Sequence, residues 1–333
     1  MRALVTGATG FIGFNLVKRL REEKWEVLCL VRPTSSREKM EKLIETGARL
    51  YPGDLSERKS LENLPTNIDV VYHLAALLDH SVREYEPFYR INVLGTQNLV
   101  ERYLNSGIRS FIFVSSIAAI GLVETGSGLL KEEVKCNPVT FYGKSKEEAE
   151  KLLLSYSREF NFPVTILRPP TVYGPGSRLS EMIEFVYRKV VNRRPIFYAD
   201  RGSALTSLCW VGNLVDALVL AAKRRCTGEL FHVDDGRPYT HREIVWTICS
   251  ALHRKPIEIF VPSTVLYPLA FFNEAVGKLG VNISGLSREK VRMLSTSLAL
   301  DSRKAQEHLG YKPVSKLGEY VREFVQTYFR ISS

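Results

Sequence analysis

TGATGFIG, residues 6–13, stands between a short apolar run, Arg2–Thr6, and a segment with helical spacing, Phe11–Glu23. Gly7 permits a tight turn, Gly10 lets backbone N–H groups approach a phosphate, and Gly13 lets a helix come close to a strand. The stretch predicts a strand-turn-helix unit that cradles a pyrophosphate, with the residues Gly7, Thr9, Gly10, Phe11, Ile12 and Gly13. The alternative is that the glycines only permit a tight corner.

Short apolar runs alternate with longer amphipathic segments through the first half of the chain. The runs predicted as buried strands are Arg2–Thr6, Glu26–Val31, Asp69–Leu74, Phe111–Ser115 and Val164–Arg168, and helical spacing occurs in Phe11–Glu23 and Glu86–Asn105. This alternation predicts an α/β fold with a doubly wound parallel sheet, in which ligands bind at the carboxyl ends of the strands.

The alternation ends near Gly174. Helical patterns follow at Ser180–Val191 and Leu214–Lys223, with a return strand near Leu230–Val233. We expect a dinucleotide-binding Rossmann domain over residues 1–173, with its return strand near 206–236. A smaller substrate-binding lobe is expected to comprise residues 174–205 and 237–333.

The composition is that of an ordinary globular protein. Of 333 residues, 45% are apolar and 25% charged, which excludes a disordered chain. The net charge of +10 comes without a nucleic-acid-binding signature, so we assign it to solvated surface and an anionic small-molecule ligand, not to nucleic acid. Five scattered cysteines without a C-x-x-C pair argue against disulfides or a metal site and favour the cytoplasm.

Neither a signal peptide nor a transmembrane segment is expected. The N-terminus lacks the apolar core of a signal peptide. The longest apolar stretch, Ile257–Phe272, is short and is interrupted by Glu258, Pro262 and Pro268. Its side chains Phe260, Leu266, Tyr267, Phe271 and Phe272 either wall an apolar pocket or form the core of the small lobe.

The end of the second strand selects the dinucleotide. No carboxylate occurs from Val27 to Arg37, whereas Arg32, Arg37 and Lys39 can surround a 2′-phosphate, so NADP is favoured over NAD. Taken alone, Arg37 and Lys39 fit a solvated helix start better than a phosphate site. Further strand ends provide Asp54 and Leu55, and then Leu74, Ala75 and Ala76, for the adenosine. Asp54 could instead cap a helix.

Tyr142 and Lys146 are expected one turn apart on the same face of a helix that follows the fifth strand. Hydride transfer to a carbonyl leaves an oxyanion that must be protonated, and a phenol near pKa 10 is a poor acid at neutral pH. An ammonium some 4 Å away could lower the phenol pKa by about two to three units. Ser116 would hold the substrate oxygen, or Ser115 if the strand ends one residue earlier.

Four motifs in this order, TGATGFIG, VSSIAAIG (114–121), YGKSK (142–146) and LRPPTVYGPG (167–176), resemble the extended short-chain dehydrogenase/reductase family, the NAD-dependent epimerase/dehydratase-like group. The resemblance implies that Ser116, Tyr142 and Lys146 form a catalytic triad in which the last two also contact the cofactor. It further implies that Asn92 supports a proton path and that Pro169 and Val172 meet the nicotinamide. Asn92 could alternatively be a surface residue of a helix.

The stretch WVGNLVDA (210–217) is similar to the 3β-hydroxysteroid dehydrogenase and dihydroflavonol reductase branches. Thr206 and Ser207 stand where the sugar-nucleotide enzymes of the family carry an Arg. We therefore expect an NADP-dependent reductase or dehydrogenase that interconverts a secondary alcohol and a ketone on a cyclic or apolar substrate. The alternatives are a sugar-nucleotide epimerase or dehydratase with tightly bound NAD, and a non-catalytic NADP sensor or scaffold. A homodimer is suggested by the resemblance only.

Overall fold

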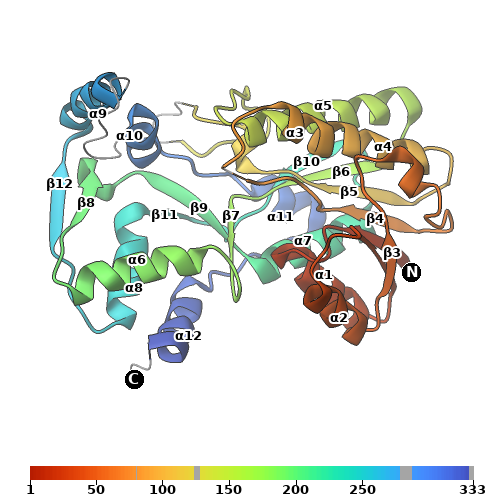
Figure 1. Cartoon of the computed structure of the whole chain (residues 1–333), viewed down its shortest axis with the longest axis horizontal. Helices are drawn as coiled ribbons and strands as arrows, with labels where there is room; N and C mark the ends of the chain where they lie inside the picture. The colour runs from red at the N-terminus through yellow and green to blue at the C-terminus, as the bar shows by residue number, and fades with distance from the viewer. Residues whose placement is uncertain (80, 124–127, 278–286, 330–333) are drawn as a thin grey trace.

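A computed structural model describes residues 1–79, 81–123, 128–277 and 287–329 of the chain (Figure 1). The sheet and the helices that cover it lie at the N-terminal side of the molecule, on the right in Figure 1. A second group of smaller sheets and helices lies on the left.

Within the described residues, seven strands form one parallel sheet in the order β10-β6-β5-β4-β1-β2-β3. The chain reverses its direction of winding between β1 and β4, and such a switch point opens a crevice at the carboxyl ends of the strands. The predicted α/β doubly wound fold is confirmed. The strands are β1 (Arg2–Thr6), β2 (Glu26–Val31), β3 (Arg49–Pro52), β4 (Val70–His73), β5 (Ser110–Val114), β6 (Val164–Arg168) and β10 (Glu229–His232).

Helices cover both faces of the sheet because successive strand residues point to opposite sides. Ala3 and Val5 belong to the core that contains buried residues of α1 and α7, whereas Leu4 belongs to the core beneath α4 and α5. The helices of this part are α1 (Phe11–Glu22), α2 (Arg37–Glu45), α4 (Gly95–Tyr103), α5 (Phe141–Phe160), α7 (Val211–Arg224) and α11 (Arg303–Leu309), with the short 3-10 turns η1 (Arg58–Leu61) and η3 (Ile117–Ala119).

The single helix predicted over Glu86–Asn105 is wrong in one respect. The segment begins as α3 (Glu86–Phe88), continues as a π-helical stretch, η2 (Tyr89–Leu94), and becomes regular only in α4. A π-helical stretch has i→i+5 hydrogen bonds, which the helical spacing of the sequence does not predict, and such stretches are frequent at functional sites. Asn92 lies within it.

The remaining elements form the smaller, mostly C-terminal part. The described residues place β7 (Thr171–Tyr173), β9 (Leu205–Trp210) and β11 (Pro238–Thr240) in a mixed sheet, and β8 (Ile196–Ala199) beside β12 (Glu258–Val261). A separate core joins them to the neighbouring helices. The helices are α6 (Leu179–Val191), α8 (His241–Ala251), α9 (Ser263–Gly277), α10 (Arg288–Ser295) and α12 (Leu317–Phe329), with the 3-10 turn η4 (Asp200–Gly202). The domain boundary at residue 173 stays a prediction.

The two expectations for the apolar segment Ile257–Phe272 stand differently. Phe260, Tyr267, Phe271 and Phe272 are exposed, with 36 to 61% of each residue's surface accessible, so the expectation that they form the lobe's core is wrong. That they wall an apolar pocket stays a prediction. Among the described residues, no helix is long and apolar enough to span a bilayer. The five cysteines are free thiols.

Gly13 is where the first helix meets the glycine turn. A Cβ on Gly13 would lie 2.2 Å from the Gly7 carbonyl oxygen and 2.8 Å from Ala8 Cα, which are backbone atoms that cannot move independently. We therefore expect Gly13→Ala to lower the free energy of unfolding by about 2 kcal/mol or more in urea titrations. Gly318→Ala is the control, because a Cβ on Gly318 meets nothing within 4 Å. Equal stability of the two variants would contradict the close approach.

Candidate active site

The glycine turn leaves the start of α1 open to a ligand. The N-cap is Gly10, which offers no side chain to the N–H groups of the first turn, and that turn carries no acidic residue. Gly7 adopts a φ of +71°, and a Cβ there would lie 2.7 Å from the Ala75 nitrogen, so the turn and the end of β4 touch. The exposed N–H groups and the helix dipole provide a phosphate site.

A cavity of about 250 Å³ lies at these strand ends. Nine of the predicted cofactor residues line it: Gly7, Thr9, Gly10, Arg32, Asp54, Leu55, Leu74, Ala75 and Ala76. Arg37 does not line it; its side chain is exposed and pairs with Glu41 at 2.8 Å. Phe11, Ile12, Gly13, Pro169 and Val172 are also outside this lining.

Several lining residues were missed by the sequence analysis: Thr6, Leu30, Val31, Ser35, Gly53, Leu77 and Ile91. For Ser35, a signal was present in the sequence: the hydroxyl-rich run Thr34-Ser35-Ser36 follows Arg32, and a serine hydroxyl at this strand end can also bond a phosphate. Ile91 comes from the π-helical stretch and has no local signature.

Asp54 is engaged within its own turn. Its Oδ1 accepts hydrogen bonds from the Ser56 nitrogen at 2.9 Å and from the Ser56 hydroxyl at 2.8 Å. The N-cap of the following turn η1 is Glu57, so Asp54 does not cap that helix. Its position in the cavity wall remains compatible with the predicted contact to an adenosine.

Asn92 is buried, with 2% of its surface exposed, so the alternative of a surface residue is wrong. Its side chain accepts from the Leu77 nitrogen at 2.7 Å and donates to the Leu77 carbonyl at 3.1 Å and to the Ser145 hydroxyl at 2.8 Å. Asn92 therefore fastens the segment after β4 to the start of α5, next to Tyr142.

Tyr142 lies in the first turn of α5, where Thr140 caps the helix through the Gly143 nitrogen at 3.0 Å. A Cβ on Gly143 would lie 2.2 Å from the Ala118 carbonyl oxygen, so this glycine lets η3 and Ser116 approach the tyrosine. Burial raises the pKa of Tyr142 to about 12, and a hydrogen bond from Ser116 acts in the opposite direction. The phenol is a protonated donor at neutral pH.

Lys146 is buried, with 2% of its surface exposed. Its Nζ donates to the Val114 carbonyl at 2.8 Å and lies 4.5 Å from the Phe113 ring centre and 5.9 Å from the Tyr142 ring centre. Burial lowers the pKa of Lys146 to about 7, while Glu150 raises it. The phenol pKa is raised here, opposite to the predicted lowering by Lys146, because burial dominates at Tyr142 and the Lys146 Nζ lies 5.9 Å from the ring centre.

β5 ends at Val114, one residue earlier than predicted, yet Ser115 does not take the place of Ser116. The Ser115 hydroxyl is buried and donates to Glu150 Oε1. Ser116 accepts from the Ala118 nitrogen at 3.1 Å and interacts with Tyr142. The structure therefore brings Ser116, Tyr142 and Lys146 together at the end of β5.

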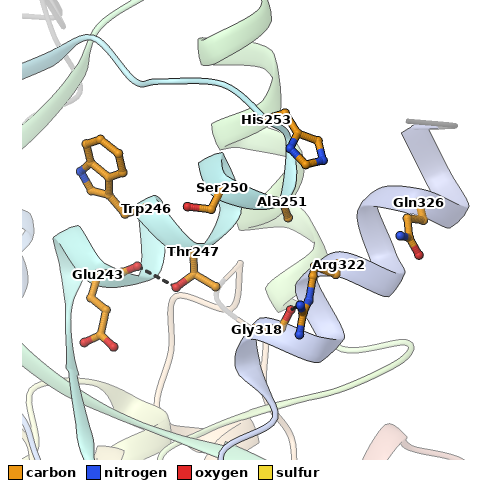
Figure 2. A pocket seen from close by; sticks show the side chains of 9 residues that line it. All are labelled: Glu243, Trp246, Thr247, Ser250, Ala251, His253, Gly318, Arg322 and Gln326. Atoms are coloured by element: carbon orange, nitrogen blue, oxygen red, sulfur yellow. Dashed lines mark hydrogen bonds between the residues drawn. The ribbon is translucent and has the colours of Figure 1, made fainter. Parts of the chain in front are cut away.

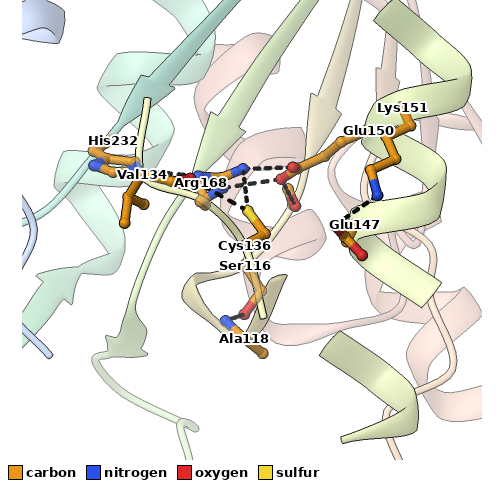
Figure 3. A network of polar contacts seen from close by, with 10 residues as sticks. Ser116, Ala118, Val134, Cys136, Glu147, Glu150, Lys151, Arg168 and His232 are labelled. Carbon is orange, nitrogen blue, oxygen red and sulfur yellow. Dashed lines mark hydrogen bonds and ion pairs between the residues drawn. The ribbon is translucent and has the colours of Figure 1, made fainter. Parts of the chain in front are cut away.

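A buried ion pair between Arg168 and Glu150 lies near this cluster, and Figure 3 shows it with Ser116. Arg168 donates to both carboxylate oxygens of Glu150, from Nε at 3.0 Å and from Nη2 at 2.5 Å. The same guanidinium reaches His232 Nε2 at 3.3 Å and Cys136 Sγ at 3.7 Å. Burial and the adjacent Arg168 charge lower the pKa of His232 to about 3, so the imidazole is neutral.

Tyr142 faces a second cavity of about 400 Å³. Its lining comes from the segment after β4, the start of α5 and α10: Leu78, Asp79, Val82, Arg83, Phe88, Val139, Thr140, Phe141, Tyr142 and Glu289. Another cavity, of about 610 Å³, lies between α8 and α12 (Figure 2), away from every predicted site residue. No residue from the carboxyl end of a sheet strand lines this cavity, so we do not assign the active site to it.

The loop after β6 lies against the same cluster. The Pro169 carbonyl accepts from the Ile117 nitrogen at 2.8 Å, and Val172 pairs with Cys209 in β7 and β9. Ser207 stands where the sugar-nucleotide enzymes are expected to carry an Arg. It is buried, and its hydroxyl donates to Asp234 Oδ2 at 2.8 Å. The Ser207 hydroxyl therefore spends its hydrogen bond within the protein and not on a ligand.

A glycine turn at the switch point of a parallel sheet, with a tyrosine and a lysine at the neighbouring strand end, defines a dinucleotide-binding α/β protein. The NAD dependent epimerase/dehydratase family matches residues 3–233. The chain belongs to this family, the extended short-chain dehydrogenases/reductases, whose members are typically enzymes that use NAD(P) and a small-molecule substrate.

Three characterised relatives illustrate its range. A UDP-glucose 4-epimerase of Vibrio cholerae is 30% identical over 99% of this chain and 96% of its own length. A ketoreductase for 4-hydroxy-2-methyl-3-oxo-4-farnesyl-3,4-dihydroquinoline-1-oxide from Stigmatella aurantiaca is 28% identical over 93% of this chain and 92% of its own. The 3beta-hydroxysteroid-dehydrogenase/decarboxylase isoform 2 of Arabidopsis thaliana is 24% identical over 99% of this chain, which spans 62% of that protein.

Solved structures share the fold. The crystal structure of gox2253 has a TM-score of 0.82 and 27% identity, covering 99% of both chains. A dTDP-glucose 4,6-dehydratase of Bacillus anthracis, in complex with NAD, has a TM-score of 0.75 and 21% identity, covering 99% of this chain and 97% of its own.

The ion pair behind the site generates a stability prediction. Glu150→Gln leaves the Arg168 charge buried without a carboxylate, and we expect the free energy of unfolding in urea to fall by about 3 to 5 kcal/mol. Glu41→Gln is the matched control, because it breaks the exposed pair with Arg37, and its effect should stay below about 0.5 kcal/mol. Similar losses in both variants would contradict a structural role for the buried pair.

Proposed function

We propose that the protein is an NADP(H)-dependent oxidoreductase that interconverts a secondary alcohol and a ketone on an apolar, cyclic substrate. The observation that carries this proposal is the position of Tyr142. Its phenol lies with Ser116 and Lys146 at the end of β5 and faces a cavity of about 400 Å³, and one strand, β4, separates β5 from β1 and its glycine turn.

The residues of the first cavity fit a dinucleotide. Gly7, Thr9 and Gly10 would hold the pyrophosphate at the start of α1, and Asp54 with Leu55, Leu74, Ala75 and Ala76 would surround the adenosine. Arg32 lies in the wall at the end of β2, where an NAD-binding protein would carry a carboxylate. A guanidinium there favours the 2′-phosphate of NADP, with Ser35 as a further donor. Bound in this way, the cofactor supplies a hydride.

The proton is handled by side chains of the chain itself. At neutral pH the Tyr142 phenol is protonated, because burial raises its pKa to about 12, and it can protonate a substrate oxygen as the alkoxide forms. Ser116 would align that oxygen, and Lys146 would bind the nicotinamide ribose. Asn92, which bonds Ser145 in the next turn of α5, would support the supply of protons. Pro169 and Val172 would line the nicotinamide end.

The proposed substrate class is supported by two kinds of relatives and by one difference between this chain and the sugar-nucleotide enzymes. The Stigmatella relative is a ketoreductase for a ring ketone, and the Arabidopsis relatives are 3beta-hydroxysteroid dehydrogenases/decarboxylases. Thr206 and Ser207 replace the arginine that sugar-nucleotide enzymes would need for a diphosphate, and Ser207 is committed to Asp234. The five free cysteines suit a protein of the reducing cytoplasm, and a homodimer is part of this proposal.

Epimerisation of a nucleotide sugar is the second candidate. The 30% identity to the Vibrio UDP-glucose 4-epimerase over nearly the full length favours it. An epimerase returns the same hydride to its substrate and retains NAD, whereas a reductase consumes NADPH. Purification without added cofactor, followed by incubation with UDP-, GDP- and dTDP-sugars, separates the two. Retained NAD with conversion of a sugar and no net cofactor consumption would replace the reductase proposal.

The cofactor preference is testable by titration. We expect NADPH to bind at least about tenfold more tightly than NADH, since one charge-assisted contact worth about 1.4 kcal/mol suffices. Arg32→Asp should invert the ratio in fluorescence titrations. Arg37→Gln is the control and should leave the ratio unchanged, because Arg37 pairs with Glu41 outside the cavity. Tighter binding of NADH to the unmodified protein would refute the preference.

The division of labour between Tyr142 and Lys146 is testable with NADPH and a panel of cyclic and aryl ketones. Tyr142→Phe should lower kcat by at least about a hundredfold and leave NADPH affinity nearly unchanged, because phenylalanine keeps the ring beside the cofactor and loses only the hydroxyl that transfers the proton. Lys146→Ala should weaken both turnover and NADPH binding. If the two variants lose cofactor affinity equally, these separate roles are wrong.

A further inference from the structure

His73, the last residue of β4, is fully buried, and both nitrogens of its imidazole are hydrogen-bonded. Nδ1 lies 2.7 Å from the hydroxyl of Thr6, which occupies the paired position on β1. Nε2 lies 2.8 Å from the hydroxyl of Thr96, in the first turn of α4. Both threonines are also fully buried, so the ring joins two hydroxyls that water does not reach.

The contact with Thr96 decides which nitrogen of the ring carries the proton. The Thr96 hydroxyl donates to the Asn92 carbonyl at 2.6 Å, and a carbonyl can only accept. Because its hydrogen is used there, Thr96 accepts from His73, and Nε2 is the protonated nitrogen. Burial, together with the Lys146 charge, lowers the pKa of His73 to about 3. The ring is therefore neutral at physiological pH, and its Nδ1 is an acceptor.

The contact with Thr6 reaches the wall of the cofactor cavity. The Thr6 hydroxyl donates to Nδ1 of His73, and the Thr6 oxygen accepts from the Ala75 nitrogen at 3.2 Å. Thr6 and Ala75 both line the cavity of about 250 Å³. The Ala75 nitrogen is also the atom that a Cβ on Gly7 would approach to 2.7 Å, so it lies directly against the glycine turn. The imidazole thus holds one side of the predicted dinucleotide site.

We propose that His73 is a positioning residue that couples the wall of the cofactor cavity to Asn92. On one side, the Ala75 nitrogen donates to Thr6, which donates to Nδ1. On the other side, Nε2 donates to Thr96, which donates to the Asn92 carbonyl. A neutral imidazole offers an acceptor and a donor on two edges of one rigid ring. The effect on cofactor binding does not depend on the reaction, whereas the effect on turnover rests on the proposed function.

Asn92 carries this restraint to the helix of Tyr142. Its side chain accepts from the Leu77 nitrogen at 2.7 Å and donates to the Ser145 hydroxyl at 2.8 Å. Thr96 bonds the carbonyl four residues earlier, a contact that bends helices, and it does so where the π-helical stretch η2 passes into α4. His73 therefore acts on the proton-handling side of the site through Asn92 and not by direct contact with the reacting atoms.

Packing by itself does not require an imidazole at this position. The His73 ring centre lies 5.5 Å from that of Phe113 and 6.0 Å from that of Phe111, and an apolar side chain could make such contacts. His73→Asn and His73→Leu separate the two roles, because their side chains are similar in volume and only Asn offers an oxygen to the Thr6 hydroxyl. We expect His73→Asn to bind NADPH at least about fivefold more tightly than His73→Leu in fluorescence titrations. Equal affinities would overturn the proposal.

The state of the ring is measurable by long-range ¹H–¹⁵N NMR on the full chain labelled with ¹⁵N-histidine. The sequence has 6 histidines, and the signals of His73 are those that His73→Asn removes. We expect Nε2 to carry the proton and Nδ1 to remain unprotonated from about pH 5 to about pH 8. A proton on Nδ1 in this range would overturn the proposal, because Thr6 could then not donate to the ring.

Thr6→Val removes one hydroxyl and keeps the shape of the side chain. It should weaken NADPH binding at least about fivefold, because the Ala75 nitrogen loses its acceptor and the cavity wall is no longer tied to His73. Thr165→Val is the matched control. Thr165 is a buried strand residue whose hydroxyl donates to the Cys226 carbonyl at 2.9 Å, and it lines neither cavity of the site. Unchanged binding by Thr6→Val, or an equal loss in Thr165→Val, would overturn the proposal.

Thr96→Val tests the connection to Asn92. It should leave NADPH affinity within about twofold and lower kcat with a ketone substrate at least about fivefold, because the Asn92 carbonyl loses its donor. Unchanged kcat, or a loss of NADPH affinity equal to that of Thr6→Val, would overturn the division into two sides. If the unmodified protein reduces no ketone, the proposed reductase function fails, while the NMR spectra and NADPH titrations still decide the role of His73. Melting curves by circular dichroism verify folding, and if neither His73 variant folds, the threonine variants decide.

Discussion

The buried pair between Arg168 and Glu150 is the contact on which the candidate site depends. Glu150 lies one turn after Lys146 on α5, and Arg168 ends β6, so the pair joins the helix that carries Tyr142 to the strand next to the edge strand β10. Ser115, directly after β5, and His232 from β10 complete its hydrogen bonds. Charges removed from water persist only where partners satisfy them, so these four elements can meet in only a narrow range of geometries. The position of the phenol follows from that restriction.

The two cavities lie next to each other at the carboxyl ends of the strands, because the winding direction of the chain reverses between β1 and β4. Gly7 and Gly10 shape one, and Tyr142 lies in the wall of the other. Asn92 connects them, since it bonds the backbone of Leu77, which lines the first cavity, and Ser145 in α5. Cofactor and substrate sites on such an edge are held by rigid strand ends, while the chemistry depends on a few side chains that point into the crevice.

The smaller part of the fold is where the sequence was least informative. The apolar run Ile257–Phe272 has the composition of a buried segment, and its sequence pattern offers no distinction between an inward and an outward face. Pairing of β12 with β8 turns Ile259 outward, and α9 leaves Phe271 and Phe272 in solvent. Hydrophobicity predicts that a side chain gains by leaving water, but not which contact of the fold removes it from water.

The sequence by itself determined the parallel α/β architecture, the glycine turn, nine residues of the first cavity and the grouping of Ser116, Tyr142 and Lys146, because local spacing and strand order dictate these features. Only the tertiary structure decided which neighbouring hydroxyl faces Tyr142, that Asn92 is buried in a π-helical stretch, and that Arg37 turns away to Glu41. It also decided that burial raises the Tyr142 pKa and lowers that of Lys146. Such properties arise from desolvation and from contacts between residues distant in sequence, which periodicity does not encode.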